Sequence, residues 1–167
     1  MDKIIIIDFG SQYTQLIAKQ IRKLKVYSEV VPYNKFDVGE IGENTKGLIL
    51  SGSPRSVIDE SGPTLDKDFL KETTIPILGI CYGSQLLAKV YGEDVTEGTH
   101  REFGRHTINI VDNNTLLKDI RSNIDVWMSH NDTISSEKNI QVLAKTTNNI
   151  IAIFKVREKN IYGLQYH

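Results

Sequence analysis

The sequence lacks the features of a disulfide-bonded, metal-binding or membrane-spanning chain. It has one cysteine, Cys81, in 167 residues, so no internal disulfide can form, and no Cys/His spacing is typical of a zinc site. We therefore expect no metal, and a reducing compartment such as the cytoplasm. The N-terminal apolar run is only four isoleucines, far short of the roughly 20 residues that span a bilayer, so no membrane partner is expected.

Charge of one sign is not concentrated anywhere in the chain either. The formal net charge is −1, charged residues make up 25% of the sequence, and no block of five like charges occurs. Electrostatics therefore give no reason to expect nucleic acid as a partner. With 40% hydrophobic residues, no repeat and no low-complexity linker, residues 1–167 have the profile of one globular domain.

Short apolar runs alternate with helical patterns through the first half of the chain. Lys3–Asp8 is a β-branched run that predicts a buried strand, and apolar residues within Gln12–Leu24 recur at helical spacing. The segments SEVVPY, GLILSGSP and IPILGI predict further strands, with helices expected around Leu65–Lys71 and directly after Cys81. This alternation predicts an α/β fold with an open, mostly parallel central sheet and helices on both faces.

The pattern changes from Arg105 onward. Five strand-like runs follow, RHTINIV, DVWMSH, IQVLAKT, IIAIFKV and IYGLQYH, with one helix-sized interruption near Leu116–Ile120. We expect these runs to add antiparallel strands to the sheet in the C-terminal half.

The lone cysteine lies in a motif with chemical meaning. GICYG, from Gly79 to Gly83, has the spacing of a nucleophile elbow, in which small flanking residues allow a sharp turn between a strand and a helix. A helix starting near Ser84 would favour the thiolate, and the Tyr82 N–H could stabilise an oxyanion. The alternative is a buried cysteine that acts as a small apolar residue. The motif favours the nucleophile.

A thiolate nucleophile needs a base, and the chain has four histidines. His100 and His106 lie in a polar stretch and are expected at the surface. His130 and His167 each end a strand-like run, where an open parallel sheet gathers its active site, and spacing alone does not choose between them. The glycine-containing turn in LILSGSP could supply a second oxyanion donor, or it could be an ordinary turn.

Together these segments resemble the class I, triad-type glutamine amidotransferases. DFGSQYTQLIAKQIR, LILSGSP, GICYGSQLLA, HREFG, DVWMSHND and YGLQYH match segments of that family in order, from the first strand to the last residue. The resemblance implies a flavodoxin-like fold and a glutaminase domain over residues 1–167. Two of the segments, DFGSQYTQL and DVWMSH, match a branch in which ammonia passes to an ATP-pyrophosphatase domain or subunit that converts XMP to GMP.

The resemblance also implies a role for each matching position. Cys81 would attack the side-chain amide of glutamine and release ammonia through a thioester, with His167 as base and then acid. The backbone N–H groups of Tyr82 and of the Gly52-Ser53 turn would form the oxyanion hole. The groups that hold the two charged ends of glutamine would be Gln85 and main-chain atoms of Ser129, His130 and Asn131. No cofactor is implied for this domain; ATP and Mg²⁺ would serve the synthetase domain, whose nucleotide-binding loop this sequence lacks.

Three departures from the family pattern matter. Ser53 and Asn131 stand where the family has glycine, so a positive φ would be strained at Ser53 and easier at Asn131. The family continues after the histidine with P-E-V, whose glutamate orients the imidazole, and a closing helix, whereas this sequence ends at His167. We therefore expect a domain cut before its C-terminal end, and a chain that is severely slowed as it stands.

The motifs predict only in outline which surface faces the synthetase domain, and they do not choose among related activities. HREFG and the region Trp127–Asp132 are expected to face the synthetase domain, although Trp127 could equally be core. Two other functions also stay open. The chain could be an amidotransferase of another pathway or a γ-glutamyl peptidase, or it could be a catalytically silent binding module that kept the fold.

Overall fold

The structure, a computed structural model, describes residues 1–113 and 115–167 without the side chains of His100 and Thr115, so the predicted surface position of His100 lies outside the described residues. Within this part of the chain, nine strands form one sheet in the order β2-β1-β3-β4-β9-β8-β7-β5-β6. The strands are β1 (Lys3–Asp8), β2 (Tyr27–Pro32), β3 (Thr45–Leu50), β4 (Ile77–Ile80), β5 (Val95–Ile110), β6 (Asn123–Ile134), β7 (Ile140–Thr146), β8 (Ile151–Val156) and β9 (Ile161–Leu164).

The predicted α/β class is confirmed, and the sheet divides into two halves. From β2 to β9 every neighbouring pair is parallel, in the order 2-1-3-4 followed by β9, which occupies the fifth position of a flavodoxin-like sheet. From β9 to β6 every neighbouring pair is antiparallel. The C-terminal half of the chain therefore adds both the last parallel strand and the antiparallel extension.

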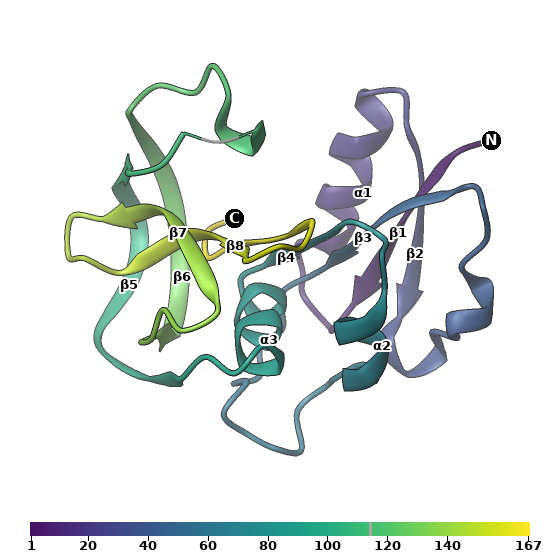
Figure 1. Cartoon of the computed structure of the whole chain (residues 1–167), viewed down its shortest axis with the longest axis horizontal. Helices are drawn as coiled ribbons and strands as arrows, with labels where there is room; N and C mark the ends of the chain where they lie inside the picture. The colour runs from purple at the N-terminus through teal and green to yellow at the C-terminus, as the bar shows by residue number, and fades with distance from the viewer. Residues whose placement is uncertain (114) are drawn as a thin grey trace.

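Helices cover the parallel half of the sheet on both faces (Figure 1). The helical elements are α1 (Thr14–Lys23), α2 (Lys67–Glu72), α3 (Tyr82–Val90) and the 3₁₀ turns η1 (Tyr33–Lys35), η2 (Val38–Glu40) and η3 (Thr115–Leu117). The helix expected near Leu116–Ile120 is only the turn η3, because Asp119 has a φ of 64° and a right-handed helix cannot continue through that conformation.

Two apolar cores hold these layers together. Alternate residues of β1, Ile5 and Ile7, pack with Leu86 and Leu87 of α3 in the larger core. The smaller core lies in the antiparallel half and includes Met128. None of the helices in the described ranges is both long and apolar enough to cross a membrane.

The pairing of β4 with β9 determines where the chemistry can lie. The two strands are parallel neighbours with Ile80 opposite Leu164, so their carboxyl ends meet at the same edge of the sheet. The backbone N–H of Cys81 continues the ladder by donating to the Leu164 carbonyl at 2.7 Å. Cys81 and His167, far apart in sequence, are therefore brought to the same edge of the sheet.

Candidate active site

Cys81 occupies a sharp turn between β4 and α3. Its φ of 52° and ψ of −109° lie outside the regions that L-residues favour, and α3 begins at the next residue. The flanking glycines are required by close packing: a Cβ at Gly79 would lie 2.6 Å from the Gly83 carbonyl carbon, and a Cβ at Gly83 would lie 2.2 Å from the Leu50 oxygen. The local geometry is that of a nucleophile elbow, as GICYG predicts.

The sulfur of Cys81 is nearly enclosed, with only 7% of the residue exposed. Sγ lies 3.7 Å from the Ser129 carbonyl oxygen and 3.7 Å from Nε2 of Gln165, and the Tyr82 N–H also donates to it. Burial raises the pKa of the thiol to about 11, and the nearby Asp132 carboxylate acts in the same direction. The N–H at the helix start favours the thiolate, as expected, but desolvation outweighs this hydrogen bond and the one from Gln165, so the net pKa of the thiol is raised.

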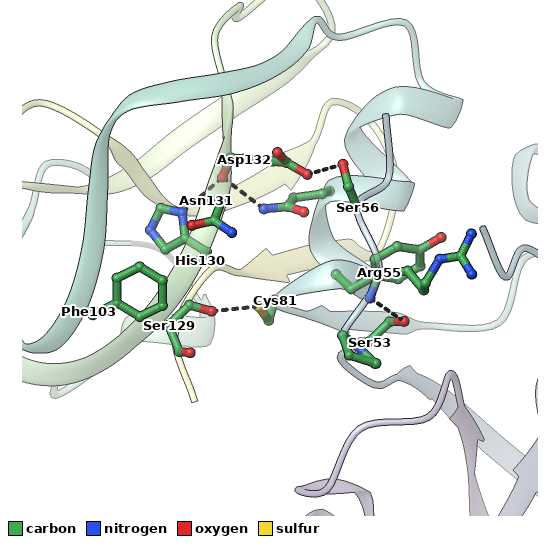
Figure 2. A pocket seen from close by; sticks show the side chains of 12 residues that line it. Ser53, Arg55, Ser56, Cys81, Phe103, Ser129, His130, Asn131 and Asp132 are labelled. Carbon is green, nitrogen blue, oxygen red and sulfur yellow. Dashed lines mark hydrogen bonds between the residues drawn. The ribbon is translucent and has the colours of Figure 1, made fainter. Parts of the chain in front are cut away.

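Cys81 lines two cavities, together with Ser53, Pro54 and Ser129. The first, of about 280 Å³ (Figure 2), is lined by Ser53, Pro54, Arg55, Ser56, Cys81, Tyr82, Gln85, Phe103, Ser129, His130, Asn131 and Asp132. The second, of about 370 Å³, is lined by Gly10, Ser11, Gln12, Tyr13, Ser53, Pro54, Cys81, Ser129 and His167. Every residue expected to hold glutamine lines the first cavity, and the expected base lines the second.

The hydrogen bonds of Gln85 determine which of its atoms can bind a ligand. Its Nε2 donates to the Asp132 carbonyl at 3.0 Å and to Oε1 of Gln165 at 3.0 Å, so both amide hydrogens are used within the protein. Gln85 lines the first cavity, and among the described residues no hydrogen-bond donor occupies its Oε1. The side chain therefore offers a hydrogen-bond acceptor to a ligand.

The two candidate bases have different environments. His130 is 5% exposed and both of its ring nitrogens are engaged, Nδ1 with the Asp132 carbonyl at 2.8 Å and Nε2 with Glu102 at 3.2 Å. Among the described residues, no hydrogen-bond partner occupies the ring of His167, which packs against Tyr13 with ring centroids 4.6 Å apart. His167 is thus the histidine whose ring is free to exchange a proton.

The environment of His167 favours a neutral imidazole. Its backbone N–H donates to the Trp127 carbonyl at 3.1 Å, which connects the end of the chain to β6. Burial lowers the pKa of its imidazole, and the charge of nearby His130 lowers that pKa further. A neutral imidazole and an un-ionised thiol therefore share the cavity in the resting state.

The turn after β3 lies beside these groups. A Cβ at Gly52 would lie 3.4 Å from Cε1 of His167, so this turn passes close to the base. Ser53 lines both cavities. Neither Ser53 nor Asn131 has a positive φ, so the strain expected at Ser53 does not arise.

Three polar side chains of the site were missed by the sequence reasoning. Asp132 and Gln165 are buried against Cys81 and Gln85, and their only signal was their place within DVWMSHND and YGLQYH. Glu102 is 1% exposed, although HREFG was expected to face a partner.

The expected synthetase-facing segments are therefore only partly at the surface. Phe103 and Trp127 are 58% and 56% exposed, so the interpretation of Trp127 as core is wrong. His106 is half-buried and its Nε2 contacts the Phe103 carbonyl at 3.3 Å.

The fold and the elbow at the edge of its parallel sheet define the class. The chain belongs to the class I glutamine amidotransferases, because the family model described as glutamine amidotransferase class-I matches residues 5–167. It is 46% identical over 168 residues to the GMP synthase (glutamine-hydrolyzing) of Bacteroides fragilis, covering 99% of this chain and 32% of that protein. The corresponding protein of Petrotoga mobilis is 45% identical, with 100% of this chain and 32% of the relative covered. The chain thus spans about a third of the length of these curated relatives.

Solved structures agree with this assignment. A proposed GMP synthase subunit from Thermoplasma acidophilum superimposes with a TM-score of 0.88 at 29% identity, covering 100% of this chain and 84% of that one. A glutamine amidotransferase from Thermotoga maritima superimposes with a TM-score of 0.81 at 22% identity. The match covers 99% of this chain and 75% of the Thermotoga chain, and it supports the fold.

Proposed function

We propose that this domain hydrolyses glutamine to glutamate and ammonia through a thioester on Cys81. The observation that carries the proposal is that Cys81 lines two cavities. The first also contains Gln85 and Asp132, and the second contains His167, whose ring has no hydrogen-bond partner among the described residues. A nucleophile that reaches a substrate on one side and a base on the other is what amide hydrolysis requires.

The first cavity fits the charged end of an α-amino acid. Oε1 of Gln85 and the Asp132 carboxylate, which accepts a hydrogen bond from Ser56, would accept hydrogen bonds from the α-ammonium group. Main-chain groups of Ser129, His130 and Asn131 would complete the binding of the two charged ends. This arrangement would direct the side-chain amide of glutamine toward Sγ of Cys81.

The proposed bond-making and bond-breaking steps use groups of this chain, glutamine and water. His167 would take the thiol proton as Sγ attacks the amide carbon, and the N–H groups of Tyr82 and of the Gly52-Ser53 turn would stabilise the oxyanion. Collapse of the tetrahedral intermediate would expel ammonia, which takes the proton from the imidazolium. Water, deprotonated by His167, would cleave the thioester to glutamate and the free thiol.

We further propose that the ammonia serves a synthetase domain or subunit that converts XMP to GMP with ATP and Mg²⁺. The proposal rests on the GMP synthases to which the chain is similar and of whose length it covers 32%. Residues 1–167 would be the glutaminase unit, and the exposed Phe103 and Trp127 would lie in the surface that faces the synthetase. The lone cysteine supports a place in the cytoplasm.

Labelling and substitution of Cys81 in the full-length protein would test the function. The glutamine analogue diazo-oxo-norleucine should label Cys81, and Cys81→Ala should abolish ammonia release from glutamine while leaving the conversion of XMP to GMP with added ammonia intact. Absence of labelling would refute glutamine hydrolysis. Loss of a different glutamine-dependent reaction, with GMP formation unchanged, would refute the assigned acceptor.

A further inference from the structure

Glu102 is a buried carboxylate that the proposed reaction does not use. It lies in β5 directly opposite His130 of β6, and it is 1% exposed, whereas the next residue, Phe103, is 58% exposed. An unpaired carboxylate in such a position would be strongly unfavourable, so its hydrogen-bond partners must compensate for its burial.

The number of protons shared by Glu102 and His130 follows from the hydrogen-bond donors and acceptors around the two side chains. Oε1 of Glu102 accepts from Oγ1 of Thr146 at 3.0 Å and from Nδ2 of Asn148 at 3.3 Å, and Oε2 lies 3.2 Å from Nε2 of His130. Nδ1 of His130 lies 2.8 Å from the Asp132 carbonyl, which can only accept, so Nδ1 carries a hydrogen. The contact between Nε2 and Oε2 requires a second proton. The pair therefore holds two protons and has no net charge.

The location of the second proton follows from the groups around the carboxylate. Thr146 and Asn148 both donate to Oε1 of Glu102, and hydrogen bonds donated to a carboxylate favour its ionised form. These two donors favour the arrangement in which the carboxylate of Glu102 is ionised and the second proton lies on the ring of His130.

Other titratable groups that face the pair come from each neighbouring element. His106 of β5 has its Nδ1 3.9 Å from Oε1 of Glu102, and the Asp132 carboxylate lies two residues along β6. His167, which follows β9, is close enough for the charge of His130 to lower its pKa. The thiol of Cys81, which follows β4, lines the same pocket as His130.

We propose that Glu102 is a positioning residue that keeps His130 doubly protonated, so that the ring fixes the Ser129–Asp132 segment and places a buried positive charge beside the glutamine pocket. The Asp132 carbonyl accepts from both Nδ1 of His130 and Nε2 of Gln85, so the ring supports the same backbone group that orients Gln85. The imidazolium cannot donate to a ligand, because both nitrogens are occupied. His130 lines the pocket and Glu102 does not, so the positive end of the neutral pair faces the ligand and favours the α-carboxylate of glutamine, opposite the acceptors that take the ammonium group. This last step rests on the proposed function.

Nitrogen-15 NMR of the histidine rings tests the proton count without any activity measurement. In the full-length protein labelled at histidine, with His130 assigned through a His130→Asn variant, both ring nitrogens of His130 should be protonated at neutral pH. In Glu102→Gln the new amide can donate to Nε2 while its oxygen still accepts from Thr146 and Asn148. The hydrogen bonds then persist, and His130 becomes neutral with its hydrogen on Nδ1. A singly protonated His130 ring in the wild-type protein would overturn the proposal.

Steady-state kinetics test the consequence for substrate. Glu102→Gln should raise KM for glutamine about tenfold, the value of one interaction with a charged group, with a much smaller change in kcat. Glu97→Gln is the matched control, because Glu97 lies on the same strand and its exposed side chain pairs with exposed Arg101 at 3.6 Å, and it should change neither constant. An unchanged KM in Glu102→Gln would refute the electrostatic role.

The two measurements separate this proposal from the proposed function. A wild-type protein that releases no ammonia from glutamine would refute the function, and the NMR result would still decide the proton count. An active enzyme with a neutral His130 would refute the proposal alone. Thr146→Val is a second variant for the case in which Glu102→Gln does not fold. It removes one donor to Glu102 and should reduce the protonation of His130 at high pH.

Discussion

The raised pKa of Cys81 predicts an unusual pH dependence of its alkylation. Burial raises that pKa from an ordinary 9.0 to about 11, which reduces the thiolate fraction at neutral pH about 100-fold. A more basic thiolate is also more nucleophilic, by roughly six- to tenfold over this interval at the usual Brønsted slope. Alkylation of Cys81 at neutral pH should therefore be about tenfold slower than that of an ordinary thiol, before any steric protection.

The assay is the rate of carbamidomethylation by iodoacetamide, followed by mass spectrometry as a function of pH. The rate should rise about tenfold per pH unit from roughly pH 7 to 9.5 without a plateau, because the thiol titrates above that range. Asp132→Asn should speed alkylation, because the carboxylate raises the pKa of Cys81. Gln165→Leu should slow it, because the Gln165 amide donates to the sulfur.

A plateau at or below neutral pH would refute this reasoning. Such a plateau is the signature of a preformed thiolate–imidazolium pair between Cys81 and His167. It would mean that an ion pair, rather than burial, determines the resting protonation of the site.

Three further predictions follow from the described contacts. Asp132→Asn should raise KM for glutamine at least tenfold, because one charged partner of the α-ammonium group is lost, and this is measured by ammonia release. Gly83→Ala should destabilise the fold by about 3 kcal/mol or more in urea titrations, because a Cβ at position 83 would lie 2.2 Å from the backbone oxygen of Leu50. Gly39→Ala is the control and should change the free energy of unfolding by about 0.5 kcal/mol, because a Cβ at position 39 would lie 3.4 Å from the side chain of Asp37. Burial and His130 lower the pKa of His167 below 6.5, so the neutral base persists to lower pH than usual, and kcat should fall only as pH drops through that lowered value.

The fold was largely predictable, because the spacing of apolar residues differs between the parallel half and the antiparallel half of the sheet. Buried β-branched runs such as Lys3–Asp8 identify parallel strands locally, and the change of pattern near Arg105 falls within β5, which belongs to the antiparallel extension. The last run was expected to be antiparallel, but it forms β9, which pairs parallel with β4 and antiparallel with β8. Strand order was not derivable in this way. Because β9 pairs with β4 across more than eighty residues, its place depends on which edges remain available, and local periodicity has no information on that.

The site was predictable where backbone motifs define it and unpredictable where buried side chains connect to one another. The Cys81 elbow follows from its flanking glycines, whose need for space is local. The roles of Gln165 and Glu102 depend on contacts with residues 80 and 28 positions away, which no local pattern shows. The thiol pKa was misjudged for a related reason, since a helix start is visible in the sequence and the degree of burial is not.

Under the proposed function, the charges of the resting site would give glutamine a part in activating Cys81. Cys81 and His167 are both neutral at rest, and the negative charge that opposes ionisation of the thiol is the Asp132 carboxylate. Under the proposed binding mode, the α-ammonium group of glutamine would lie against that carboxylate and cancel its effect on the sulfur. Binding would thereby make transfer of the thiol proton to His167 easier at the moment when an amide carbon is in place. A buried, un-ionised thiol is then a protected resting state, since it reacts slowly with other electrophiles until an amino acid fills the pocket.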